Sequence, residues 1–258
     1  MDARTTPINV AYPSAGELQL HVAAGACRFT AKPGEGDAWV AGTYYDPSGS
    51  RPARITQDGG TVRLSAGLDP IEDLTGLFSG VPRYDLTFGK ARPFALVVET
   101  GASEFNLDLG GVPLTSLVLK QGAGKCDVDF SAPNPQRMAL LNLGAGAGAM
   151  FLANLANANC DQMVVEGGAA AFRLDFGGRL QRDASVRVST GVSSVEITIP
   201  AGTAAKVDSE KLLGGLDAGD GFTKRAGAFW TEAALAGGAP VLNIKASVAL
   251  GSLQLRIR

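Results

Sequence analysis

The sequence predicts an all-β chain, either a β-solenoid or a closely related stacked β-sandwich, built from repeats of about 21–24 residues. Three observations predict this fold. Apolar residues alternate with period two in short runs, a glycine separates the runs of each pair, and the whole pattern recurs at nearly constant spacing. Period-two alternation turns one face of each strand inward, and recurrence at a fixed spacing is typical of stacked repeats. A true β-helix of this kind is expected to be right-handed.

The repeat is clearest between residues 94 and 111. There an apolar alternation around Leu96, a break at Gly101 and a second alternation around Phe105 follow one another. Each of the next four copies begins 21, 24, 22 and then 23 residues after the copy before it. The residues that take the place of Leu96 in these copies are Leu117, Leu141, Met163 and Val186. Because only the spacing varies, the extra residues are expected in the turn after each second strand.

Two further copies are expected near the termini. In the N-terminal copy Leu18 takes the place of Leu96 and Ala23 that of the break glycine, and in the C-terminal copy these residues are Ile244 and Ala249. A glycine at such a break marks a corner where the backbone needs a positive φ or a close approach to its neighbour. One copy buries too few side chains to offset the entropy of ordering it, so the copies must stack to be stable.

The repeats also predict the domain organisation. Residues 1–15 are expected to be a flexible N-terminal segment, and residues 16–258 a single repetitive all-β domain. Residues 32–93 and 205–241 interrupt the pattern and are interpreted as irregular insertions or caps, the first containing a hairpin at residues 58–60. A cap would protect a sheet edge that could otherwise pair with strands of other chains.

Composition excludes several classes of function. Hydrophobic residues make up 45 %, charged residues 19 % and the formal net charge is −2, which argues against a disordered chain and against a nucleic-acid partner. A single histidine and three cysteines without a CxxC pair give no basis for a catalytic triad, a zinc site or a disulfide framework. We therefore expect no enzyme, no catalytic residues and no cofactor. No signal peptide or membrane span is predicted, so the chain is expected to be soluble as it stands.

One segment imitates a dinucleotide-binding fingerprint. Gly144, Gly146 and Ala149 follow an apolar run and precede a helix-like segment, and Glu166 lies some twenty residues farther on. The same residues also satisfy the repeat pattern on both sides. Dinucleotide binding is therefore kept only as a remote alternative.

Acidic residues recur on the outward side of the second strand of successive copies. If the copies stack in register, Asp108, Asp127 and Asp129 lie about 4.8 Å from their equivalents and form a small acidic row with Asn106. Paired carboxylates can hold a hard cation such as calcium or act on a glycan. The plainer interpretation is a set of solvent-exposed charges.

Apolar residues also occupy the outward side of the first strand. Val97, Val118 and Val164 stand where a strand with one buried face carries polar residues. Either another part of the chain, with residues 32–93 favoured, or a partner is expected to cover them. If the row is bare, it is a candidate surface for self-association or for a partner protein.

Three segments carry a family resemblance. Residues 101–109 (GASEFNLDL), their echo at 122–130 (GAGKCDVDF) and residues 248–255 (VALGSLQL) resemble the toastrack-type domains of bacterial envelope proteins. The likeness extends to the LiaF-like C-terminal domain, named for cell-wall-active antibiotic response, and to adhesins with related repeats. It covers most of the chain from about residue 16 onward, and it brings no catalytic residues to carry over.

The resemblance implies a bacterial cell-envelope or membrane-associated location. The function it predicts is a non-enzymatic domain whose rigid β surface contacts proteins in envelope-stress sensing or scaffolding, with membrane-linked signalling proteins as partners. The alternative is a carbohydrate-binding or carbohydrate-acting β-solenoid of the adhesin kind that uses the outward acidic row.

Overall fold

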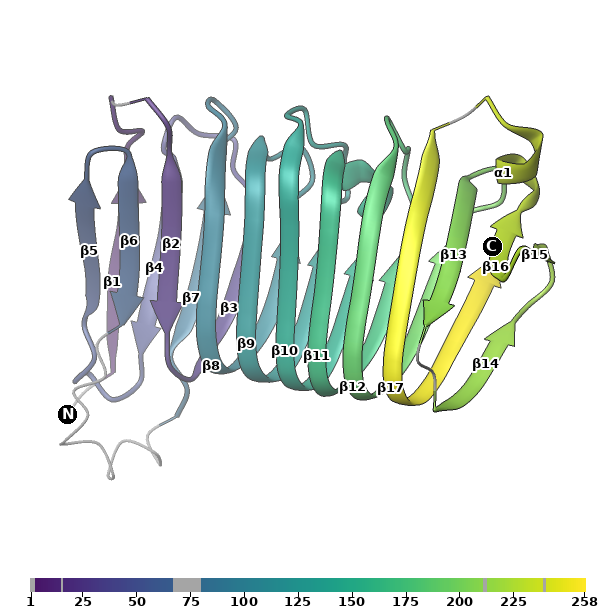
Figure 1. Cartoon of the computed structure of the whole chain (residues 1–258). Coiled ribbons are helices and arrows are strands. Elements are labelled where there is room, and N and C mark those ends of the chain that lie inside the picture. The colour runs from purple at the N-terminus through teal and green to yellow at the C-terminus, as the bar shows by residue number, and fades with distance from the viewer. Residues whose placement is uncertain (1–2, 15, 67–79, 211–212, 239) are drawn as a thin grey trace.

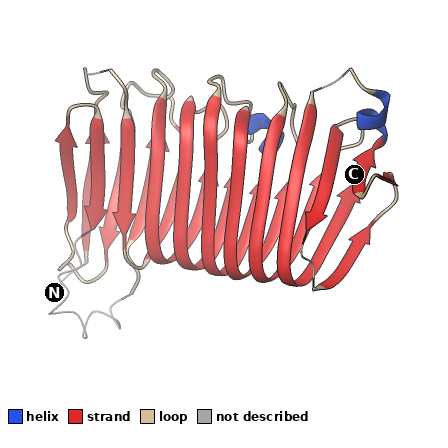
Figure 2. Ribbon diagram, in the orientation of Figure 1, coloured by secondary structure: helices blue, strands red, loops and turns tan. Residues whose placement is uncertain are grey.

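The computed structural model describes residues 3–14, 16–66, 80–210, 213–238 and 240–258. Within these ranges 17 strands form one mixed sheet that folds over into two facing layers (Figures 1 and 2). The chain runs along one layer, bends into the other and returns to start the next coil. The predicted all-β solenoid is therefore confirmed.

Six long strands make up the body of the stack. Each one bends near its middle, so that its first half lies in what we call the first layer and its second half in the second layer (Figure 1). Neighbouring long strands pair parallel. The six are β8 (Phe94–Asp108), β9 (Leu114–Asp129), β10 (Met138–Ala153), β11 (Cys160–Asp175), β12 (Ala184–Ile199) and β17 (Val241–Ile257).

The pairing of these strands matches the repeat read from the sequence. Leu96 pairs with Leu117, and the ladder continues through every predicted equivalent. The later pairs are Leu117 with Leu141, Leu141 with Met163, Met163 with Val186 and Val186 with Ile244. One detail differs, because the two runs of each copy form a single bent strand rather than two strands.

The N-terminal copy is shifted by two residues from its predicted position. It consists of β2 (Gln19–Ala24) and β3 (Cys27–Pro33), and Leu20, not Leu18, pairs with Leu96. The break therefore falls at Gly25, whose carbonyl accepts a hydrogen bond from the Gly101 amide, and not at Ala23. A shift of two residues keeps the same side chains inward, so alternation alone could not distinguish the two registers.

Shorter strands extend both layers at the N-terminal end. The first layer continues from β2 into the predicted hairpin, and the second layer continues from β3 through three strands. These strands are β6 (Thr61–Ala66) and β5 (Ala53–Asp58), then β7 (Arg83–Phe88), β4 (Val40–Asp46) and β1 (Arg4–Val10). Residues 4–10, expected within a flexible segment, instead pair antiparallel with β4 because Ile8 and Val10 have an apolar layer to bury against.

The C-terminal end is built in the same way. Strand β13 (Ala204–Glu210) continues the first layer beside β17, and β14 (Gly214–Ala218) continues the second. β16 (Ala228–Thr231), β15 (Phe222–Arg225) and helix α1 (Glu232–Ala236) complete this end. The described parts of residues 205–241 therefore form short strands and one short helix where irregular structure was expected. The assignment of residues 16–258 to a single domain stays a prediction.

The core lies between the two layers. Its aromatic part is concentrated at the N-terminal end, where the rings of Tyr44 and Tyr84 lie 4.7 Å apart and Phe29 lies within 6 Å of both Tyr84 and Phe105. The three cysteines, Cys27, Cys126 and Cys160, are buried and free. Burial raises the pKa of each thiol to about 12, so none supplies a reactive thiolate near neutral pH.

Two kinds of glycine form the bend, and β10 shows both. At Gly146 the backbone lies close to the neighbouring strand, as expected at the break, since a Cβ there would lie 2.4 Å from the Gly122 carbonyl oxygen. Gly148, two residues later, has φ +122° and would place a Cβ 1.9 Å from the Gly124 carbonyl oxygen. The sequence predicted a positive φ or a close approach at one position, whereas the structure has a close approach at Gly146 and both a positive φ and a close approach at Gly148.

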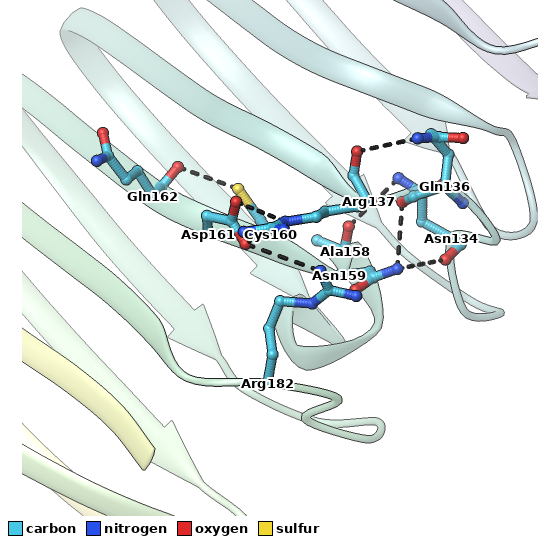
Figure 3. Close-up of polar contacts among 9 residues, drawn as sticks. All are labelled: Asn134, Gln136, Arg137, Ala158, Asn159, Cys160, Asp161, Gln162 and Arg182. Atoms are coloured by element: carbon cyan, nitrogen blue, oxygen red, sulfur yellow. Dashed lines mark hydrogen bonds and ion pairs between the residues drawn. The ribbon is translucent and has the colours of Figure 1, made fainter. Parts of the chain in front are cut away.

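Buried asparagines tie the coils together at the end opposite the bend (Figure 3). Asn134 is 1 % exposed, and its Nδ2 donates to the carbonyls of Leu114 (2.9 Å) and Ala158 (3.3 Å). Asn159 Nδ2 donates to the carbonyls of Asn134 and Gln136, both at 3.2 Å. These amides therefore supply hydrogen-bond partners to backbone carbonyls of neighbouring coils. Three successive turns are thereby fixed relative to one another. The first turn following β10 is the short 3-10 helix η2 (Leu155–Ala158).

Candidate functional site

A hollow of about 400 Å³ opens on the outer face of the second layer. The second halves of the long strands line it, and we call it the Phe151 hollow. The residues that define it are Asp127, Asp129, Phe151, Arg173, Asp175 and Arg258. Aromatic, acidic and basic side chains therefore converge on one depression of the outer face.

The hollow exists because β10 carries a small residue at one outward position. Ala153 pairs with Asp129 of β9, and β11 carries Asp175 two residues after its Arg173 pairs with Phe151. A methyl group between two carboxylate side chains leaves the space open. β10 then leaves the sheet at Asn154, which has φ 55° and begins the turn into η2.

Phe151 forms one wall of the hollow and is flanked by two cations. The Lys125 Nζ and the Arg173 Cζ lie 5.5 Å and 5.3 Å from its ring centroid. Each cation also faces a carboxylate, since Lys125 donates to Asp127 at 2.6 Å and Arg173 lies 3.7 Å from Glu196. Cation–π contacts of this kind hold the half-buried ring in place.

Hydrogen bonds orient the two carboxylates beside Ala153. Asp129 Oδ1 accepts a 2.7 Å bond from Asn154 Nδ2. Asp175 Oδ1 accepts from the Gly177 amide at 2.9 Å, and its Oδ2 pairs with Arg258 Nη1 at 2.8 Å. The polar groups around the hollow are therefore held in position before any ligand arrives.

The acidic row is in the predicted register, with Asp108 paired to Asp129 and Asn106 to Asp127. The structure separates its members, however. Asp127 and Asp129 line the hollow, whereas Asp108 lies outside it and accepts hydrogen bonds from Ser131 Oγ and the Gly110 amide. Within the described ranges no group of three or more His, Cys, Asp or Glu residues is placed to hold a metal ion.

Cation binding by Asp108, Asp127 and Asp129 stays a prediction. If it is right, millimolar calcium should raise the melting temperature of the protein and shift the amide resonances of the three residues, because a bound cation would offset the repulsion between their carboxylates. Magnesium at equal ionic strength is the control for screening by salt. Unchanged melting and unchanged resonances would discard the hypothesis.

The predicted apolar row lies on the outer face of the first layer. Val97 pairs with Val118, and Asn142 of β10 stands between Val118 and Val164. All three valines are half-buried by their neighbours in the ladder. The expectation that residues 32–93 cover them is wrong for the described strands, because β4–β7 extend the end of the stack rather than crossing its face (Figure 1). These strands form their backbone hydrogen bonds with strands at the end of the stack instead.

The structure reveals a second apolar surface that the sequence analysis missed. Val192, Leu250 and Leu213 are 59 %, 53 % and 72 % exposed and lie next to one another at the bend; we call them the bend patch. Val192 pairs with Leu250, and the Leu213 carbonyl accepts from the Gly251 amide. A signal was present, because the residue after the break is apolar in every long strand. These residues are Ala102, Ala123, Ala147, Ala169, Val192 and Leu250.

The dinucleotide alternative is wrong. Gly144, Gly146 and Ala149 lie inside the continuous strand β10, and the segment after Ala149 continues as strand to Ala153. Glu166 is the ladder partner of Gly144 on β11 and faces no phosphate loop. A pyrophosphate site of this type needs a helix N-terminus directly after the glycines, and the bend provides none.

In the described residues no helix combines the length and the apolar character needed to cross a membrane.

A family model described as the N-terminal domain of toast_rack, DUF2154, matches residues 2–152, more than half of the chain. No curated protein matches the sequence.

Solved structures share the architecture at low sequence identity. A candidate cell adhesion protein from Clostridium sporogenes is similar with a TM-score of 0.55 and 13 % identity over 100 % of both chains. A candidate adhesin from Bacteroides fragilis gives 0.44 and 10 %, over 98 % of this chain and 97 % of that one. A candidate lipid binding protein from Parabacteroides distasonis gives 0.42 and 11 %, over 100 % and 97 %. The first of these likenesses shows the fold.

Proposed function

Because the chain belongs to the toast_rack family through its N-terminal domain model, DUF2154, we propose that it is a non-enzymatic domain of the bacterial cell envelope that binds proteins. The finer part of the proposal is a role in envelope-stress sensing or scaffolding, with membrane-linked signalling proteins as partners. The likeness of residues 101–109, 122–130 and 248–255 to toastrack-type envelope domains supports that role.

A rigid surface is what this architecture offers a partner. Five parallel pairings join six long strands, and the side chains between the layers form one buried core. A sheet held by ladders on both sides and by packing from within deforms little on binding, so little conformational entropy is lost.

The observation that carries the proposal is the bend patch. Six large hydrophobic side chains are exposed in the described chain, and three of them, Val192, Leu250 and Leu213, are neighbours. Burying each such side chain contributes about 1.5–3 kcal/mol. Adjacent exposed aliphatic residues are typical of a surface that binds another protein, whereas isolated ones are ordinary.

Replacing Leu250 by lysine is expected to abolish binding of a partner protein through the bend patch without unfolding the domain. The substitution places a charge in the middle of the bend patch, whereas Leu250 makes little contribution to the core because it is 53 % exposed. Immobilised domain would be exposed to envelope extract, and sedimentation velocity would report self-association in parallel. The unfolding free energy should stay within about 1 kcal/mol of the wild type.

Leu235→Lys is the matched control, since Leu235 is also exposed, at 40 %, but lies on α1 away from the patch. Val118→Lys tests the valine row on the first layer in the same assay, and a variant that unfolds there would show that the row is structural. If Leu250→Lys and Val118→Lys both bind as the wild type does, protein contact through these faces is excluded.

One observation favours a second candidate function, carbohydrate binding. Asp127 and Asp129 of the predicted acidic row line a hollow beside an aromatic ring, and sugar sites need such a combination of polar and apolar groups. A screen for glycan binding tests this function directly.

A further inference from the structure

We propose that the Phe151 hollow is the glycan-binding site, and that it takes one ring of a neutral saccharide between the Phe151 side chain and the carboxylates of Asp129 and Asp175. This inference rests on the second candidate function and names its site and its ligand class.

The size of the hollow suits a sugar ring. Its volume of about 400 Å³ falls in the range of small-molecule sites. Its apolar surface comes from Ala153 and from Phe151, which is half-buried and so presents part of its ring to the space. A pyranose has an apolar C–H face that packs against an aromatic ring, whereas its edges carry hydroxyl groups.

The polar groups of the hollow complement those hydroxyls. Asp129 uses Oδ1 to accept from Asn154, and Asp127 uses Oδ2 to accept from Lys125. The other oxygen of each carboxylate accepts no hydrogen bond from the described residues and remains able to do so. Arg173, which lies beside the Phe151 ring, and Arg258, which pairs with Asp175, supply N–H donors to the same space. Because a hydroxyl both donates and accepts, a sugar can satisfy both kinds of group at once.

The charges of the hollow disfavour other ligands. Its lining holds four carboxylates, those of Asp127, Asp129, Asp175 and Glu196, against two guanidinium groups, so a free phosphate or an acidic sugar would be repelled. The Phe151 ring already has two cations beside it, which disfavours an ammonium ligand there. A neutral ligand rich in hydroxyls avoids both costs.

The test is binding of the full chain to an array of neutral and acidic oligosaccharides, followed by calorimetric titration of the strongest neutral binder. Phe151→Ala is expected to weaken that binding about tenfold or more, and Phe151→Tyr to retain it. Asp129→Asn should weaken it, whereas Asp108→Asn should not, because Asp108 belongs to the same acidic row but lies outside the hollow. Melting temperature confirms that each variant is folded.

The outcomes separate the site from the function. If the wild type binds no oligosaccharide, both the second candidate function and this inference fail. If the wild type binds but Phe151→Ala and Asp129→Asn bind equally well, carbohydrate binding stands and the hollow is not its site. Preference for acidic over neutral sugars would overturn the ligand class.

Discussion

Gly148→Ala is expected to lower the free energy of unfolding by about 3 kcal/mol or more, and the melting temperature by roughly 6–12 °C. Gly148 has φ +122°, and a Cβ there would lie 1.9 Å from the Gly124 carbonyl oxygen of the neighbouring strand. An alanine must therefore adopt a strained backbone and also push two strands apart at the bend. The bend cannot relax locally, since the next strand lies directly on the other side.

Two nearby glycines provide matched controls for this prediction. Gly146→Ala meets the Gly122 carbonyl oxygen at 2.4 Å but has no positive φ, so its effect should be smaller. Gly144→Ala places its methyl 3.7 Å from the Lys120 side chain, an ordinary contact, and should change stability little. Urea and thermal unfolding of the three variants measure the order of their losses in unfolding free energy. Equal stability of all three would contradict the geometry of the bend.

Phe172→Ala is expected to cost about 3–5 kcal/mol because it leaves a cavity between the layers. Phe172 is 1 % exposed, and its ring occupies the space beside Gly167, where a Cβ would approach within 2.3 Å of the ring. Few neighbours can move into the vacated volume, since ladder hydrogen bonds hold β11 on both sides.

Phe151→Ala is the control for this second prediction. Phe151 pairs with Arg173, the residue after Phe172 in the sequence, and lies on the outer face. Its removal should cost about 1 kcal/mol or less. Denaturant unfolding of both variants measures the difference. If Phe151→Ala proved the more damaging, the inward and outward faces would be exchanged, as a register slip of one residue would do.

Much of the fold could be predicted from the sequence because equivalent residues of successive repeat copies pair with one another. The ladder from Leu96 through Val186 to Ile244 follows directly from equal positions in successive copies. The N-terminal copy was misplaced because Leu18 and Leu20 face the same way and only Gly25 distinguishes the registers.

The candidate site could be predicted only in part. The acidic row was found because Asp108, Asp127 and Asp129 recur at equivalent positions. Phe151 was assigned no role: alternation places it on the outer face, but nothing near it in the sequence distinguishes a residue that lines a hollow from an isolated apolar residue on the surface. The hollow depends on Ala153 standing between carboxylates of two other strands, and residues 22 or more positions apart carry no local mark of that arrangement.

The sequence by itself determined which side chains point inward along each long strand and which residues of successive copies lie side by side. The reason is that alternation and spacing are local properties of the chain. Only the tertiary structure decided how β1, β4–β7 and β13–β16 complete the two ends, where exposed aliphatic residues gather at the bend, and where the outer face is hollowed. Those features arise from contacts between strands that are far apart in the chain. They depend both on the size of each side chain and on which strand lies beside it.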